Sequence, residues 1–293
     1  MVVLKKEIAQ PYNDGAASRI RMFKGSKIAN FIVPLMFDVS GIINLIPDRA
    51  ELQLRYFRNS PEYFLMVNST ITNKKYVVKL ESATFRMIRY HLTAAELARH
   101  NSILNSGLRL AAMMQQIKRK TFLAGEQTLQ FLCYQNILPE AIFIWFTSLK
   151  AANGDYHENP HKYILPKIRR LTIFKNEIPY PLPQGLVLNE TARRSMQLPY
   201  FYLMRMLHGG SPTFMPAHMA KGYGIFCFDM TAGNTSNSSI MSKIESGTIR
   251  IEVDLEEQLI GDPIVMFVQG MFRKNVKIQG DTTHREISIV DLL

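Results

Sequence analysis

Cysteine is scarce in this chain, and no long hydrophobic run occurs. The two cysteines, Cys133 and Cys227, are too few and too far apart for a disulfide framework or a cysteine metal site. The longest apolar run, "FIVPLMF" at 31–37, contains Pro34 and is far shorter than the roughly 20 residues of a membrane helix. The first residues show no apolar segment followed by small residues. We therefore expect a folded, non-secreted protein of a reducing compartment, with no membrane partner.

The sequence also lacks the short motifs of many enzymes. Neither G-x-S-x-G nor the phosphate loop G-x-x-x-x-G-K-[ST] occurs, and residues 222–224 lack the third glycine and the helix of a dinucleotide site. His157 and His161 are separated by Pro160, which breaks the helix that would place both on one metal. Cys227 lies between two phenylalanines, which favours a buried thiol. We predict no catalytic, cofactor-binding or metal-binding residue, no cofactor and no enzyme activity.

Positive charge is in excess, with 35 Lys and Arg against 24 Asp and Glu, a net charge of +11. Such an excess favours an acidic partner. The basic residues are dispersed, which is more typical of solvated faces than of one nucleic-acid groove. Non-specific DNA contact is therefore a hypothesis, and the residues expected to carry it are Arg169, Arg170, Arg193, Lys274 and Lys277.

Alternation of apolar and polar residues predicts β-strands. In 249–255 every second residue is apolar, so Arg250, Glu252 and Asp254 are expected to face solvent. A turn at Gly261–Pro263 leads to the next strand, and the two strands are predicted to pair with each other. Further strands are predicted at 27–39, 50–57, 77–92, 119–125, 141–149, 163–180 and 225–228.

Helix is scarce by comparison. Thr93 begins a helical stretch as N-cap, with Glu96 completing a capping box and Gly107 ending it, and 190–210 predicts one or two short helices. Many strands and few helices predict an all-β antiparallel sandwich, either Greek-key or jelly-roll, with a barrel as second choice. Asp229 is predicted to cap a turn. The expected core residues are Trp145, Phe226, Phe228, Ile249, Ile251 and Val253.

Several segments together resemble a known protein family. The most specific are "KGYGIFCFDMT" at 221–231 and "GTIRIEVDL" at 247–255, with further similarity at 163–190 and 29–66. In this order they resemble the double jelly-roll major capsid (hexon-like) proteins of Maverick (Polinton) transposons and adintovirus-like DNA viruses, over roughly residues 20–280. Cys227 departs from the aliphatic residue or alanine usual in the family.

The resemblance implies an N-terminally truncated double jelly roll. Residues 1–75 would hold the C-terminal strands of an incomplete first jelly roll, and 76–293 the second, with helical insertions near 93–106 and 190–208. It also implies a capsid subunit that forms homotrimers and, with other capsid proteins, an icosahedral shell, located in a virion or in the host nucleus or cytoplasm. A minor capsid or penton protein, a non-assembling domesticated remnant and a β-sandwich ligand-binding protein are the alternatives.

Overall fold

The structure is a computed structural model, and it describes part of the chain. Residues 28, 30, 32–33, 55–66, 76–86, 88–106, 108–188, 196–207, 215–231, 233, 236, 244–280 and 287–292 are described, with backbone alone at 104–105, 108–112, 274–280 and 287–292. The chain divides into two compact units. The first comprises 1–32, 59–75 and 115–272, and the second 33–58, 76–114 and 273–293.

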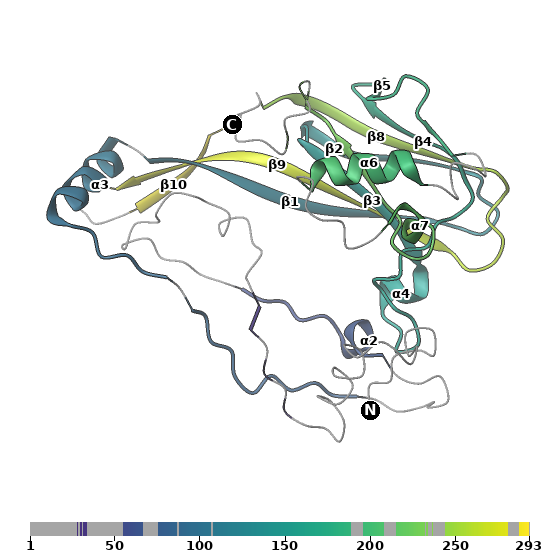
Figure 1. Cartoon of the computed structure of the whole chain (residues 1–293), viewed down its shortest axis with the longest axis horizontal. Helices are drawn as coiled ribbons and strands as arrows, with labels where there is room; N and C mark the ends of the chain where they lie inside the picture. The colour runs from purple at the N-terminus through teal and green to yellow at the C-terminus, as the bar shows by residue number, and fades with distance from the viewer. Residues whose placement is uncertain are drawn as a thin grey trace. The chain divides into compact units, whose positions relative to one another are not determined.

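Two antiparallel five-stranded sheets contain the described strands (Figure 1). Sheet A has the order β1-β9-β3-β7, with β10 added to β9, and sheet B the order β2-β8-β4-β5, with β6 added to β4. The strands are β1 (Leu108–Phe122), β2 (Thr128–Ile137), β3 (Ala141–Ser148), β4 (Ile168–Lys175), β5 (Ile178–Tyr180), β6 (Leu186–Val187), β7 (Ile225–Asp229), β8 (Ser246–Leu255), β9 (Ile264–Gly280) and β10 (Ile287–Leu292). The helices are α2 (Pro61–Phe64), α3 (Ala94–Ser106), α4 (Leu149–Asn153), α6 (Gln197–Met206) and α7 (Pro216–Met219).

The strands pair in a nested order that defines a jelly roll. Strand β1 pairs with β9, β2 with β8, β3 with β7 and β4 with β5, so early strands pair with late ones. Strand β9 also pairs with β3, and β8 with β4, which joins the nested pairs into two sheets. This is the connectivity of an eight-stranded double-sheet jelly roll. The predicted all-β antiparallel jelly-roll class is confirmed.

The predicted pairing of β8 with the strand that follows it is wrong. Strand β8 pairs with β2 and β4 in sheet B, whereas β9 pairs with β1, β3 and β10 in sheet A. The turn between them therefore crosses from one sheet to the other. Alternation along a strand tells which of its faces is buried, but the identity of the neighbouring strand depends on the whole topology.

The strands predicted in the first part of the chain differ from those of the structure. The strand predicted at 77–92 is wrong, because its described residues form no strand and are mostly exposed, as are 55–57. Strand β2 and the first part of β1 were not predicted. The predictions at 27–39 and 50–54 lie largely outside the described residues. The described residues up to 66 contain α2 and no strand, and the division into residues 1–75 and 76–293 stays a prediction.

The capping box predicted for helix α3 is confirmed. The N–H and hydroxyl of Thr93 donate to the Glu96 carboxylate at 3.0 and 2.8 Å, and the Glu96 N–H donates to Thr93 Oγ1 at 3.4 Å. These bonds favour the charged carboxylate and lower the pKa of Glu96. The predicted Gly107 stop lies outside the described residues. Helix α6 confirms the second helical prediction.

The core lies between the two sheets. Alternate residues of β3, including Ile144 and Phe146, face inward, and the Phe146 ring contacts Phe226 with centroids 6.3 Å apart. Five of the six predicted core residues are at most 3% exposed, namely Phe226, Phe228, Ile249, Ile251 and Val253. Trp145 is the exception. It points away from the core and stacks on Phe267 at 5.5 Å, because β3 is apolar on both faces and alternation places Trp145 outward.

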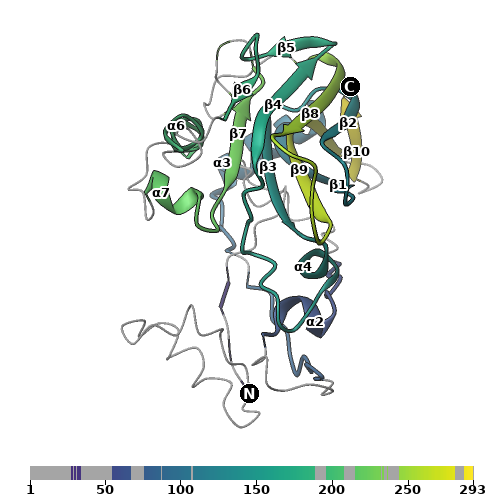
Figure 2. The same ribbon diagram turned by 90° about the vertical axis from the view of Figure 1, so that its right-hand side faces the viewer.

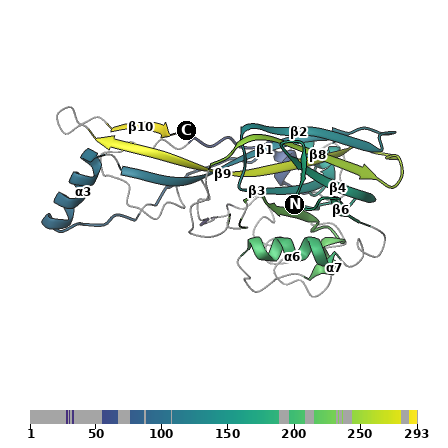
Figure 3. The same cartoon turned by 90° about the horizontal axis from the view of Figure 1, so that it is seen from above.

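Strand β7 forms one edge of sheet A, and α6 packs against it (Figure 2). Seen from above, α6 and α7 lie on the side of the sandwich away from β2 (Figure 3). The ring of Tyr202 in α6 lies 6.1 Å from that of Phe228. Covering by a helix explains why Phe226, Cys227 and Phe228 are all buried in succession, and it protects an edge strand from further pairing.

Tyr134 connects the two sheets through the core. It belongs to β2 of sheet B, yet its hydroxyl donates toward the carbonyl oxygens of Gln116 (2.8 Å) and Val268 (2.9 Å) in sheet A. Burial raises the pKa of this phenol, so the hydroxyl keeps its proton as a donor. The ring has room because residue 270 is glycine. A methyl group there would lie 2.8 Å from ring atoms of both Tyr134 and Phe272.

We expect Gly270→Ala to lower the free energy of unfolding by about 1–3 kcal/mol, because the added methyl group overpacks the core. Chemical denaturation followed by circular dichroism measures the change. In a Tyr134→Leu background the cost should shrink, since the smaller side chain leaves space. An equal cost in both backgrounds would contradict the contact between residue 270 and the Tyr134 ring.

Candidate functional site

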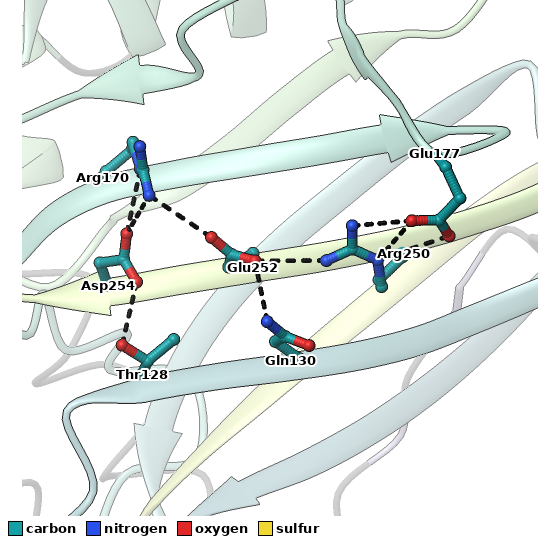
Figure 4. A network of polar contacts seen from close by, with 7 residues as sticks. All are labelled: Thr128, Gln130, Arg170, Glu177, Arg250, Glu252 and Asp254. Atoms are coloured by element: carbon teal, nitrogen blue, oxygen red, sulfur yellow. Dashed lines mark hydrogen bonds and ion pairs between the residues drawn. The ribbon is translucent and has the colours of Figure 1, made fainter.

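A connected network of polar side chains covers the outward face of sheet B (Figure 4). Strand β8 supplies the middle row, and β2 and β4 supply the partners on either side, because the three strands are hydrogen-bonded neighbours. Glu177 joins from the turn between β4 and β5. The network consists of Thr128, Gln130, Arg170, Glu177, Arg250, Glu252 and Asp254.

Asp254 is the buried member of this network, with only 4% of the residue exposed. Its Oδ2 accepts from Arg170 Nη2 at 2.7 Å and Nε at 3.0 Å, and its Oδ1 accepts from the Thr128 hydroxyl at 3.0 Å. The prediction that Asp254 faces water is therefore wrong. The side chain does point outward, but partners from both neighbouring strands cover it. A buried carboxylate is tolerable only with such partners.

Glu252 and Arg250 continue the network along β8. Glu252 accepts from Gln130 at 3.1 Å, from Arg250 at 3.2 Å and from Arg170 at 3.4 Å. Arg250 also donates to Glu177 at 2.8 Å and lies 3.9 Å above the Phe174 ring. The bonds to Glu177 raise the pKa of Arg250. Each charge of the row thus has a partner inside the protein, so the network holds strands β2, β8 and β4 together.

Local sequence gives one signal for this network. Asp254 stands between Val253 and Leu255, where a strand buries its apolar residues, and aspartate is disfavoured in strands. Such a residue needs a cation nearby, but the identity of that cation depends on which strand lies beside β8. Arg170 is 84 residues away in sequence.

Only part of the predicted DNA-contact set lies within the described side chains. Arg169 and Arg170 are 63% and 43% exposed, and both approach Asp254, at 4.0 and 2.7 Å. The guanidinium of Arg170 is therefore used within sheet B. Arg193 and the side chains of Lys274 and Lys277 lie outside the described part. DNA contact stays a prediction.

The histidine pair does not form a metal site in the described structure. The backbone N–H groups of His157 and His161 bond to Asp155 and Asn159, and the His161 ring packs edge-on against Tyr63 at 6.5 Å. Among the described residues, no group of three or more His, Cys, Asp or Glu is arranged to hold a metal ion. Within the same residues, no helix is long and apolar enough to cross a membrane.

Both cysteines are buried and free, as the sequence suggested for Cys227. Burial raises the pKa of the Cys133 thiol to about 12 and also raises that of Cys227. The Cys133 thiol donates to the Ile249 carbonyl at 3.3 Å. Neither thiol is an activated nucleophile.

The predicted capping role of Asp229 is confirmed. Its carboxylate accepts from the N–H (3.0 Å) and hydroxyl (2.6 Å) of Thr231 and from the hydroxyl of Ser236 (2.6 Å). The Asp229 carboxylate thus caps the end of strand β7.

The class of protein that these features define is an antiparallel double-sheet jelly roll. No protein-family model matches the chain, and no curated protein matches it. Solved structures that it resembles include the PBCV-1 virus capsid, at 7% identity and a TM-score of 0.42, covering 69% of this chain and 55% of that chain.

Two further solved structures are similar in the same way. PBCV-1 VP54, fitted into a reconstruction of the virophage Sputnik, has 9% identity and a TM-score of 0.40, with 69% of this chain and 55% of that chain covered. The Sputnik virophage structure has 11% identity and a TM-score of 0.32, with 62% and 39% covered. The chain spans less than two thirds of the length of these proteins. Because the scores are low, the fold rests on the strand pairing.

We expect Arg170→Met to lower the free energy of unfolding by about 2–3 kcal/mol, because it leaves the buried Asp254 with only the exposed Arg169, 4.0 Å away, as a cation. This is below the cost of breaking a wholly buried pair, since Arg170 is partly exposed. Lys167→Met is the matched control. It removes an exposed pair with Glu257, 64% exposed on both sides, and should cost at most about 1 kcal/mol. Urea denaturation compares them, and equal losses would contradict a structural role for Asp254.

The raised thiol pKa values predict that neither cysteine of the folded chain reacts quickly with a disulfide reagent at pH 8. A thiol with a pKa near 12 is almost wholly protonated at pH 8, and the thiolate is the reactive form. Titration with a chromogenic disulfide should show two reactive thiols only after denaturation. A rapid reaction of one thiol in the folded chain would contradict this description.

Proposed function

We propose that this chain is a structural capsid subunit of a virus or of a virus-derived DNA transposon of the Maverick (Polinton) type. The observation that carries the proposal is the coincidence of family-specific sequence with jelly-roll strands. The two segments that most resemble the capsid family contain β7, which pairs with β3 in sheet A, and β8, which pairs with β2 and β4 in sheet B. In such a protein the function lies in shape and self-association, with no active site.

The described features support a rigid building block. The network on the outward face of sheet B ties β2, β8 and β4 together, Tyr134 ties sheet B to sheet A, and α6 covers the edge strand β7. Rigid sandwiches of this kind hold their loops in fixed positions. Subunit contacts are then made by loops.

One pair of loops offers a surface for such contacts. The loop after β1 and the loop after β8 hydrogen-bond to each other, Gly125 N–H to the Leu259 carbonyl and Leu259 N–H to the Glu126 carbonyl, both at 2.9 Å. They present two exposed apolar side chains, Leu123 at 56% and Ile260 at 87%. We propose that this end of the sandwich contacts neighbouring subunits.

The finer parts of the proposal follow the sequence resemblance. The subunits form homotrimers that assemble with other capsid proteins into an icosahedral shell. Residues 1–75 contribute strands to a first jelly roll, and 76–293 form the second. The positive charge of the chain serves contact with packaged DNA inside the virion.

Size-exclusion chromatography with light scattering tests the proposal on the full chain. A homotrimer has a mass of about 100 kDa, three times the 33.6 kDa of the chain. Ile260→Glu should shift the protein toward the monomer, because it places a charge in an apolar contact.

The matched control is Ile178→Glu, at a β5 residue that is 68% exposed and belongs to neither loop. It should leave the mass unchanged. A wild-type chain that remains monomeric at all concentrations would contradict the proposed function, and equal effects of both variants would contradict the loop contact alone.

A further inference from the structure

A polar hollow of about 230 Å³ lies in the first unit, at the outward face of sheet A. Three parts of the chain meet there: the start of α2, the end of α4, and the strands β1 and β9. The lining residues are Asn59, Ser60, Tyr63, Arg119, Ala152, Asn153 and Phe267.

The wall of the hollow is held in place by contacts around Gly154. A methyl group at this glycine would lie 3.2 Å from the Tyr63 nitrogen and 3.3 Å from Glu62 Cβ, so α2 approaches the chain closely here. Gly154 also has a φ of +94°, which favours glycine. The Tyr156 hydroxyl donates to Glu62 at 3.1 Å. The chain segments that carry Asn59 and Asn153 are therefore held close to each other.

The floor of the hollow carries a cation. Gln269 Nε2 bonds to Gln115 Oε1 at 2.7 Å, so odd-numbered residues of β9 and β1 share the outward face, Phe267 and Arg119 among them. Even-numbered Lys118 lies instead over the core ring of Tyr134, at 5.2 Å. Of the three basic residues at 118–120, strand alternation therefore places Arg119 on the outward face, beside the hollow.

Arg119 differs from the arginines of sheet B in its surroundings. Arg170 and Arg250 are bonded to carboxylates, whereas no carboxylate lines the hollow. Within the described part of the chain, no hydrogen-bond or ion-pair partner of Arg119 is present. The guanidinium donors are therefore available to a ligand.

We propose that this hollow binds a phosphate group. A guanidinium, two carboxamides and a hydroxyl supply donors from different walls, and phosphate has oxygens in a tetrahedral arrangement that can accept from several directions at once. A planar carboxylate would use fewer of these walls. The half-buried Phe267 ring adds an apolar side, suited to a nucleotide that carries the phosphate. The proposal does not depend on capsid assembly.

The test compares two probes on the full chain. Inorganic phosphate at fixed ionic strength is followed by thermal shift, and a fluorescein-labelled oligothymidine by anisotropy. Arg119→Gln removes the cation, and Lys120→Gln is the matched control, with the same charge change on the next residue and the opposite face. Asn153→Asp adds a carboxylate to the hollow. Circular dichroism verifies that each variant is folded.

We expect Arg119→Gln and Asn153→Asp to weaken binding of at least one probe by about tenfold, and Lys120→Gln by less than about twofold. Loss with both probes identifies any phosphate as the ligand, and loss with the oligonucleotide alone identifies a nucleic-acid backbone. Equal effects of Arg119→Gln and Lys120→Gln would overturn the proposal, because dispersed surface charge would explain them. Tighter Arg119-dependent binding of a polyglutamate peptide would also overturn it.

Discussion

The Asp254 carboxylate joins three strands that are far apart in the sequence. It accepts from Thr128 of β2, 126 residues away, and from Arg170 of β4, 84 residues away. The buried charge makes the arrangement selective, because a shift of either neighbouring strand would take one partner away from a buried carboxylate, at a cost of roughly 1–5 kcal/mol. Sheet B is thereby fixed as a unit, and the opposite sheet can pack against a defined surface.

The packing of the core depends on sheet B. Tyr134 of β2 reaches sheet A, and the space for its ring depends on Gly270 of β9. The inward residues of β8 and β3 then fill the interior, and α6 covers the edge at β7. Two of the features that stay exposed are the loop end with Ile260 and the hollow with Arg119. These exposed features suit contacts with other molecules, which agrees with a proposed function in assembly.

The sequence predicted those parts of the fold that depend on local chemistry. Alternation identified the buried face of β8, and Thr93 and Glu96 identified the start of α3. It could not predict the partners of β8, because alternation selects a face and leaves the neighbour open. The burial of Asp254 follows from that neighbour. The hollow around Arg119 was also beyond prediction, since its residues come from separate segments that no local motif links.

The jelly roll requires that β8 pairs with β2 and that only a loop connects β8 to β9 in the other sheet. Oxidation of double-cysteine variants tests it, because facing residues of an antiparallel pair have Cα atoms about 4.5–5.5 Å apart, within disulfide range. Gln130 faces Glu252 in the β2–β8 register, so Gln130→Cys with Glu252→Cys should cross-link within one chain. Cross-linking of Glu252→Cys with Phe267→Cys instead, the pair that a β8–β9 hairpin would bring together, would contradict the jelly roll.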